Sequence, residues 1–179
     1  TVWLALDDHS DATRAIITDR IGVVITGGFH EDGLSHSIDA LGGAYDRPNL
    51  LRILKDSRIG AFGALALILA LTLKISLLVD LGGTAPTAFI LGQSLSRALP
   101  VIQLGVQPYV RRDDPESKSR DVARSGRLQA SITVVWVGLI AAASILAGIA
   151  PVIIMGCVSA MVVVGVVFGI YIHRRAGGL

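Results

Sequence analysis

Cysteine and charge are both scarce in this sequence, and each scarcity argues against a class of protein. The single cysteine, Cys157, lies in an apolar run, so neither a disulfide framework nor a cysteine-based zinc site is available. Charged residues make up 17% of the 179 residues and the net charge is +2, which is too small to indicate nucleic-acid binding. The first residues carry Asp7, Asp8 and Asp11 and no basic segment, unlike a signal peptide.

Several short motifs of well-known catalytic sites are also missing. The sequence has no phosphate-binding loop with its lysine, no G-x-G-x-x-G after a strand and no G-x-S-x-G. His30 and Glu31 begin like a zinc-protease helix, but the next histidine is at position 36 rather than 34. These familiar chemistries are therefore set aside.

Apolar residues dominate what remains. They make up 52% of the chain, and the mean hydropathy is +0.64. Each of four apolar segments is close to the roughly 20 residues that a helix needs to cross a bilayer; they are Ile59–Val79, Pro86–Val106, Gln129–Ala150 and Pro151–Ile172. We therefore predict an all-α, polytopic membrane bundle, a single domain over 1–179, with four transmembrane helices in two hairpins (59–107 and 129–172). A shorter N-terminal helix over Ala12–Thr26, capped by Ser10 or Asp11, is too charged for a confident span.

The distribution of basic residues predicts the orientation of this bundle. The two short turns, near 80–85 and 148–151, contain no Lys or Arg, whereas the segment 108–128 and the tail from His173 contain several. Basic residues favour the cytoplasmic side. We therefore expect the segments 26–58 and 108–128 to lie in the cytoplasm, with the lipid bilayer as the surrounding phase.

The segment 26–58 concentrates the polar chemistry. If the stretch after Gly27-Gly28 is helical, Asp32, His36 and Asp39 stand at i, i+4 and i+7 on one face. Two carboxylates and an imidazole can hold a divalent cation, and hard oxygen ligands suit Mg²⁺. The alternative, more frequent for such spacing, is a solvated helix face with ordinary capping residues.

Two further features of this segment concern helix ends. Asp46-Arg47-Pro48 predicts the start of a short helix that lies on the membrane surface. Asp56 or Ser57 is expected to cap the helix that follows.

Two charges lie inside the predicted spans. Lys74 and Arg97 have no acidic residue at similar depth in the spans, and such charges usually face the bundle interior or a wet cavity. An anionic ligand is an attractive partner for Arg97 and for Lys74, although Lys74 can equally snorkel to the interface. Small-residue faces, Gly138 with Ala142 and Gly165 with Gly169, favour close packing within the bundle over a homo-oligomer contact.

Three motifs together carry a resemblance to a known family. They are Thr26-Gly-Gly-Phe-His-Glu-Asp-Gly-Leu, Asp39-Ala-Leu-Gly-Gly and Leu54-Lys-Asp-Ser-Arg-Ile-Gly-Ala-Phe-Gly. Lys74, the pair Ser96-Arg97 and Pro108-Tyr109 fit the same pattern. The chain resembles cobalamin synthase, also called adenosylcobinamide-GDP ribazoletransferase, from about residue 20 to the end. It is expected to be a fragment that lacks both ends of that family.

The resemblance implies a bacterial inner-membrane transferase that uses Mg²⁺. Adenosylcobinamide-GDP and α-ribazole, or its 5′-phosphate, would be the substrates, and GMP would leave. The roles that it implies are metal binding by Asp32, His36 and Asp39; catalysis by His30, Asp32, Asp39 and Arg58; and substrate binding by Lys55, Asp56, Ser57, Lys74 and Arg97. His30 would be the base for the ribazole hydroxyl or would orient a carboxylate.

The chain departs from the family pattern at one point. The family reads roughly His-x-Asp-Gly-Leu-Ala-Asp-x-x-Asp; His30, Asp32 and Asp39 match it, whereas Ser35 and His36 replace the Ala and the middle Asp. Imidazole suits Mg²⁺ less well than carboxylate does. Either the site tolerates His36, or the metal differs, or this copy is weak or inactive.

Two other classes of function stay open at this point. A membrane phosphotransferase of the CDP-alcohol type ranks second, because its Asp-Gly-x-x-Ala-Arg arrangement is absent. A non-enzymatic transporter or scaffold would use Arg97 in an anion pathway, but no repeat symmetry is visible.

Overall fold

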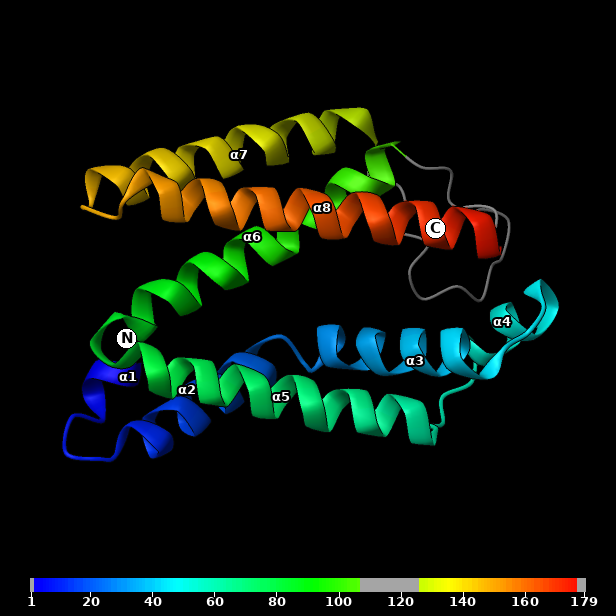
Figure 1. Ribbon diagram of the computed structural model, residues 1–179, viewed down its shortest axis with the longest axis horizontal. Helices are drawn as coiled ribbons and strands as arrows, with labels where there is room; N and C mark the ends of the chain where they lie inside the picture. Colours follow the sequence, from blue (N-terminus) through cyan, green and yellow to red (C-terminus); the bar gives the residue numbers. More distant parts are fainter. Residues whose placement is uncertain (1, 107–125, 177–179) are drawn as a thin grey trace. The chain divides into compact units, whose positions relative to one another are not determined.

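The fold is helical throughout the part of the chain that the structure describes. The structure, a computed structural model, describes residues 2–106 and 126–176, and these ranges contain helices and no strand (Figure 1). The prediction of an all-α protein is therefore confirmed. The chain divides into two compact units, Thr1–Phe89 and Ile90–Leu179, which are described one at a time. Most of the predicted loop 108–128 lies outside the described residues.

The first unit begins with two helices, α1 (Val2–Ala5) and α2 (Asp11–Ile25). The hydroxyl of Ser10 accepts a hydrogen bond from the amide of Thr13 at 3.3 Å, which satisfies one of the free amides at the start of α2. This cap confirms the predicted helix start, and the helix ends one residue earlier than predicted.

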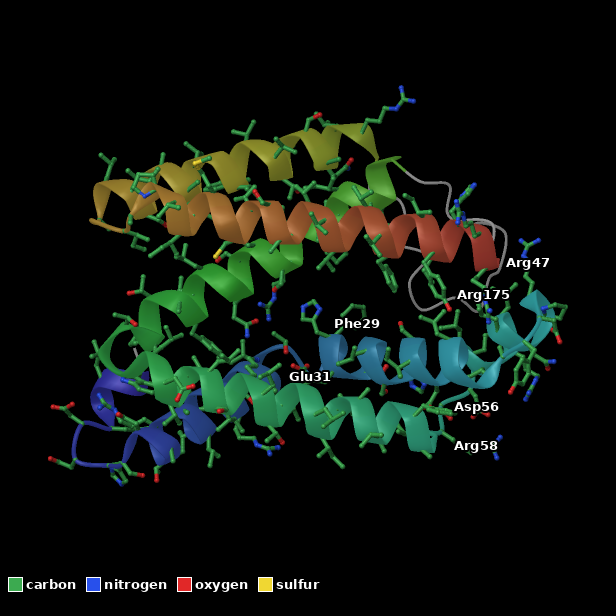
Figure 2. All side chains as sticks on the ribbon, viewed as in Figure 1. Phe29, Glu31, Arg47, Asp56, Arg58 and Arg175 are labelled. Carbon is green, nitrogen blue, oxygen red and sulfur yellow. The ribbon has the colours of Figure 1, made fainter. Side chains whose placement is uncertain are left out.

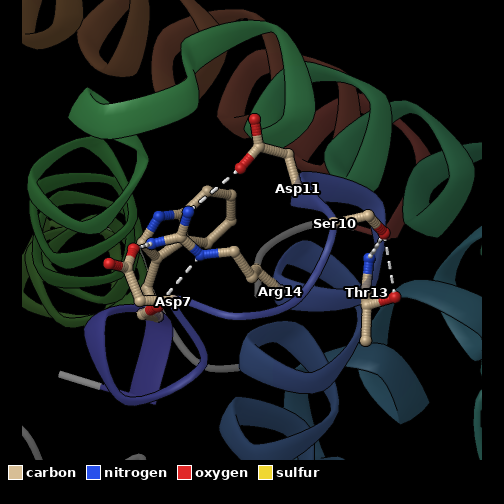
Figure 3. A network of polar contacts seen from close by, with 6 residues as sticks. Asp7, Ser10, Asp11, Thr13 and Arg14 are labelled. Atoms are coloured by element: carbon tan, nitrogen blue, oxygen red, sulfur yellow. Dashed lines mark hydrogen bonds and ion pairs between the residues drawn. The ribbon is translucent and has the colours of Figure 1, made fainter.

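Arg14 joins the two helices of this N-terminal segment (Figure 3). Its guanidinium group lies 4.9 Å from the ring centre of Trp3, and its Nε donates to the carbonyl oxygen of Trp3 at 3.1 Å. Its two terminal nitrogens bind Asp7 at 3.0 Å and Asp11 at 3.2 Å. One side chain therefore fixes the turn between α1 and α2 against a buried indole.

Glycines end α2, and a proline helps to start the short α4 (Arg47–Ile53). Gly27 and Gly28 have φ of 62° and 67°, a left-handed conformation that stops a helix and favours glycine. The next helix, α3 (Phe29–Gly43), begins directly afterwards. Asp46 caps α4 by accepting from the amide of Asn49 at 2.9 Å, which holds the pKa of Asp46 below its usual value. The predicted break and the predicted start of α4 are both confirmed.

The cap predicted for the next helix, α5 (Ala61–Leu81), is wrong. Its N-cap residue is Gly60, not Asp56 or Ser57. Asp56 cannot serve there because both of its carboxylate oxygens bind Arg58. Helix α5 packs along α3 and against α2, and Figure 1 shows α3 beside α5.

The buried core of the first unit gathers where α1, α2 and the end of α5 meet. Its buried members are all apolar: Trp3, Ala15, Leu78 and Ala85. Three partly buried side chains, Ile75, Val79 and Phe89, pack against them. Burying such side chains is the main source of stability for this packing.

Three helical segments of the described chain are long and apolar enough to cross a membrane. They are Ala61–Gly105, Arg127–Leu146 and Pro151–Arg175. The first contains α5 and α6 (Ala85–Val106), joined by the 3₁₀ turn η1 (Gly82–Thr84). The helices α5, α6, α7 (Arg127–Leu146) and α8 (Pro151–Ala176) follow the four predicted segments closely. Four separate spans in two hairpins are not confirmed, because α5, η1 and α6 form one helical run.

Close contacts hold the helices of the second unit together, where α7 lies beside α8 (Figure 1). Gln103 Nε2 on α6 donates to the carbonyl oxygen of Gly165 on α8 at 2.8 Å. A β-carbon added at Gly105 would lie 2.5 Å from the β-carbon of Ala130 on α7, and one at Gly165 would collide with Leu99. Gly165 therefore packs inside the unit, whereas a β-carbon at Gly138 meets no described atom within 4 Å.

Candidate functional site

Asp32 and His36 are in polar contact on α3. Nε2 of His36 lies 3.2 Å from Oδ1 of Asp32, and the two side chains are 14% and 67% exposed. The spacing of one helical turn allows this contact. The Asp32 carboxylate thus stays open to solvent, whereas most of the imidazole is covered, and its Nδ1 is buried without a hydrogen-bond partner among the described residues.

Asp39 lies on the same helix face, but its carboxylate turns to α5. Its Oδ2 accepts from the amide of Gly60, and its Oδ1 accepts from the amide of Gly63, both at 2.7 Å. The residue is 7% exposed. The structure therefore brings Asp32 and His36 together and commits Asp39 to the first turn of α5.

Asp56 and Arg58 form a charged pair in the connection before α5. Nε of Arg58 donates to Oδ1 of Asp56 at 3.0 Å, and Nη2 donates to Oδ2 at 2.7 Å, while the amide of Arg58 also donates to Oδ1 at 3.1 Å. These bonds from Arg58 hold the pKa of Asp56 well below its usual range and raise the pKa of Arg58. Lys55 and Ser57, in the same connection, are exposed.

Asp32 lies toward the start of α3, whereas the Asp56–Arg58 pair lies toward its other end. Figure 2 places Asp56 and Arg58 at the start of α5, and Phe29 and Glu31 at the other end of α3. Asp32 and Asp39 are seven positions apart, which is about 10 Å along a helix axis. The start of α5, which Asp39 contacts, therefore lies about two turns along α3 from Asp32.

The first turn of α3 carries two more polar groups. The ring of His30 is exposed and stands edge-on to the ring of Phe29, with 5.8 Å between their centres. Oε2 of Glu31 is buried and has no hydrogen-bond partner among the described residues. An unpaired buried carboxylate oxygen is costly, so Glu31 is a second candidate for binding a cation, which the sequence analysis missed.

Lys74 has a protein partner that was not expected from the sequence. Its Nζ lies 2.6 Å from Oδ1 of Asp19 on α2 and 5.3 Å from the ring centre of Phe89. Asp19 is 1% exposed. The charge of Lys74 is therefore neutralised within the protein, and its predicted contact with substrate stays a prediction.

Arg97, in the second unit, is held by its own helix. Nη1 of Arg97 donates to the backbone oxygen of Gln93 at 2.9 Å and also to Oε1 of the same residue. The guanidinium group is partly buried. Its predicted role toward an anionic ligand is untested by this geometry.

The residues predicted to bind Mg²⁺ do not fit one three-ligand site in this structure. Both oxygens of Asp39 are committed to backbone amides, and residues 2–106 and 126–176 contain no group of three acidic, His or Cys side chains arranged to hold a metal. Of the three, Asp32 offers an exposed carboxylate. Such a residue fits the usual environment of Mg²⁺, which takes one or two carboxylates with water and substrate phosphates.

Comparison with known proteins decides the family. The family model described as cobalamin-5-phosphate synthase matches residues 1–179, the whole chain. The chain belongs to this family. The resemblance, expected from about residue 20 to the end, is thereby confirmed, and the match extends to residue 1.

Relatives within the cobalamin-5-phosphate synthase family are similar over much of the chain. A protein of Shewanella woodyi named adenosylcobinamide-GDP ribazoletransferase is 48% identical over 108 residues, which cover 58% of this chain and 42% of that protein. Proteins of the same name from Shewanella sp. (strain W3-18-1) and Shewanella amazonensis are 40% and 44% identical, over 68% and 64% of this chain and 48% and 45% of their own lengths. The chain spans about half the length of the curated relatives it matches. No solved structure matches it.

Three residues that shape the site of this cobalamin-5-phosphate synthase family member escaped the sequence analysis. Asp19 lies on the helix that was judged too charged for a span, but it stands one turn from Ala15 on the buried face. The backbone amides of Gly60 and Gly63 donate hydrogen bonds to the Asp39 carboxylate. A pair of glycines three apart at the start of an apolar span was the available signal for a close approach.

Proposed function

We propose that this protein is an adenosylcobinamide-GDP ribazoletransferase of a bacterial inner membrane. The observation that carries the proposal is the match of the whole chain to the cobalamin-5-phosphate synthase family. The relatives named adenosylcobinamide-GDP ribazoletransferase supply the activity. The three long apolar helices fit a membrane protein.

The reaction is a phosphoryl transfer from a diphosphate. The 5′-hydroxyl oxygen of α-ribazole forms a bond to the phosphorus that is attached to cobinamide. The bond from that phosphorus to the bridging oxygen breaks, and GMP leaves with the bridging oxygen. The hydroxyl proton passes to His30, which is exposed at the start of α3 and whose imidazole acts as the general base.

The charged residues of the first unit have separate tasks in this reaction. Arg58, oriented by Asp56, binds the diphosphate as a planar two-pronged donor. Lys55 and Ser57 lie in the same connection and contact the same substrate. Asp32 binds Mg²⁺ with His36 as its neighbour. The ion, when bound, adds positive charge against the diphosphate oxygens.

The proposal includes four spans with the polar segments in the cytoplasm. The helical run Ala61–Gly105 has 45 residues, or about 67 Å at 1.5 Å per residue, roughly twice the thickness of a bilayer core. A turn near η1, where Gly82 has φ of 50°, supports two spans in place of one. Lys and Arg are absent from 82–84, which supports an outer location for this turn.

A transfer assay tests the proposal. The protein in proteoliposomes receives adenosylcobinamide-GDP and α-ribazole, with and without Mg²⁺, and GMP and the cobalamin product are measured. Product that depends on Mg²⁺ is expected. The absence of product under both conditions would contradict the proposal and favour another membrane phosphotransferase or a transporter.

Asp32→Asn and Asp80→Asn form a matched pair for the same assay. Asp32→Asn is expected to reduce transfer on the order of 100-fold or more, as loss of a charge-stabilising group does elsewhere. Asp80 is exposed near the end of α5, so Asp80→Asn should retain activity. Full activity of Asp32→Asn would contradict the proposal that Asp32 binds Mg²⁺.

A further inference from the structure

The carboxylate of Asp39 closes the N-terminal end of a neighbouring helix. Each of its two oxygens accepts one hydrogen bond, from the backbone amide of Gly60 or of Gly63, with a donor–acceptor distance of 2.7 Å. Gly60 is the N-cap residue of α5, and Gly63 lies in its first turn. The first amides of a helix have no partner within the helix, and a negative charge there is favourable. Asp39 therefore does for α5, from another helix, what a capping side chain usually does from the same one.

Both glycines are required by this contact. A β-carbon on Gly60 would lie 2.6 Å from Oδ1 of Asp39, and one on Gly63 would collide with Oδ2 and lie 2.6 Å from the backbone oxygen of Ser35. Gly60 has φ of −88°, which any residue adopts. The need for glycine at Gly60 therefore comes from the Asp39 carboxylate and not from the backbone.

The contact also fixes the segment that carries Arg58. Gly60 follows Arg58 by two residues, and the Asp56–Arg58 pair fixes the other side of that arginine. On its own helix, Asp39 lies one turn after His36. The Asp39 carboxylate thus fixes the connection that carries Arg58 against α3, the helix that bears Asp32 and His36.

We propose that Asp39 is a positioning residue, which clamps the start of α5 onto α3 and so places Arg58, and that it is not a ligand of the metal. To bind a metal, the buried Asp39 carboxylate would have to give up one or both of its short hydrogen bonds to the backbone amides. The placement of Arg58 for catalysis rests on the proposed function, whereas the clamp itself does not.

Hydrogen exchange without any metal tests the clamp. In Asp39→Asn the new amide group presents a donor to a backbone donor, so at least one of the two hydrogen bonds is lost. Loss of a hydrogen bond to a charged group corresponds to roughly 10- to 100-fold faster exchange, expected in a peptide covering 57–66. Asp46→Asn removes a carboxylate cap from α4 and is the matched control; it should leave the exchange of 57–66 unchanged. Unchanged exchange in Asp39→Asn would overturn the proposal.

Metal binding and kinetics separate positioning from ligation. The probe is Mn²⁺, with free ion measured by electron paramagnetic resonance. Asp39→Asn and Gly60→Ala, which keeps the carboxylate but displaces it, should both lower kcat and leave the Kd for Mn²⁺ within about 2-fold, whereas Asp32→Asn should weaken Mn²⁺ binding about 10-fold or more. Gly43→Ala, whose β-carbon would meet only an ordinary contact at 3.6 Å, should match the wild type.

Two outcomes distinguish this proposal from the function itself. Weakening of Mn²⁺ binding by Asp39→Asn alone, as strong as that by Asp32→Asn, would make Asp39 a ligand and overturn the proposal. If the wild type transfers nothing, the proposed function fails, and the exchange of 57–66 still decides whether Asp39 is a clamp.

Discussion

Lys74 Nζ lies 2.6 Å from a carboxylate oxygen of Asp19, a residue that is 1% exposed. Both carboxylate oxygens of Asp19 are buried, and neither has a hydrogen-bond partner among the described residues, so the contact with Lys74 is an ion pair only. The pair links α2 to α5 within an apolar segment. Burying two charges carries a desolvation cost, so such a pair is stable only while both members are present.

Removal of one member of this pair should therefore be worse than removal of both. Lys74→Met leaves Asp19 buried without its counter-charge and should destabilise the protein by about 3–5 kcal/mol. Lys74→Met combined with Asp19→Asn should be less destabilising than Lys74→Met alone, and therefore also less than the sum of the single changes. Thermal unfolding in detergent measures each variant, with the exposed Asp80→Asn as the control. Additive effects would mean that the two charges are not coupled.

The sequence was sufficient for most local features of the fold, although it gave the wrong cap for α5. The caps at Ser10 and Asp46 and the break at Gly27-Gly28 depend on neighbours within a few positions, and a pattern of residue types captures them. The helices over the apolar segments follow from composition in the same way.

The contacts between residues on different helices could not be predicted from the spacing of residues in the sequence. Asp39 was predicted to bind metal because one helix face carries Asp32, His36 and Asp39. Its actual partners are amides of α5, and that contact depends on how closely α5 approaches this face. Similarly, Lys74 and Asp19 lie on different helices, and their distance along the chain gives no reason to pair them. Tertiary packing decides both contacts.

Ionisation of Asp56 should have no influence on activity near neutral pH. Arg58 lowers the pKa of Asp56, so the stabilisation by this pair is complete above the pKa of the unfolded carboxyl, about 3.9, and is lost only as the pH falls through the lower folded value. Asp56→Asn should reduce kcat/KM on the order of 10-fold, as loss of an orienting partner does. The ratio of variant to wild type should stay constant from about pH 6 to 8.5. A ratio that changes across this range would contradict the assignment.

Cysteine labelling should establish the orientation of the spans. In a Cys157→Ser background, a membrane-impermeant maleimide added to intact cells should label Thr84→Cys and Ala147→Cys but label Ser57→Cys only after permeabilisation. This pattern follows from four spans with the basic segments inside. Thr84→Cys labelled only after permeabilisation would mean that α5 and α6 do not form two spans around η1.

Close packing of α6 against α7 should make Gly105 intolerant of a methyl group. A β-carbon there would lie 2.5 Å from the β-carbon of Ala130, which can move only with its backbone, and overpacking of this kind costs about 1–3 kcal/mol. Gly138→Ala on α7 is the matched control, because its β-carbon meets no described atom within 4 Å and alanine favours a helix. The unfolding midpoint should fall for Gly105→Ala and stay level or rise for Gly138→Ala.

His36→Asp should change metal affinity and stability in opposite directions. The new carboxylate would stand one turn from Asp32, where two like charges weaken a helix by about 0.2–0.5 kcal/mol without metal. Two hard oxygen ligands suit Mg²⁺ better than one with an imidazole, so the Mg²⁺ concentration for half-maximal transfer should fall several-fold. The unfolding midpoint should be lower than that of the wild type in chelator and should rise more on addition of Mg²⁺. His36→Asn, which introduces no charge, controls for loss of the imidazole. If His36→Asp and His36→Asn respond alike to Mg²⁺, the metal does not bind at this turn of α3.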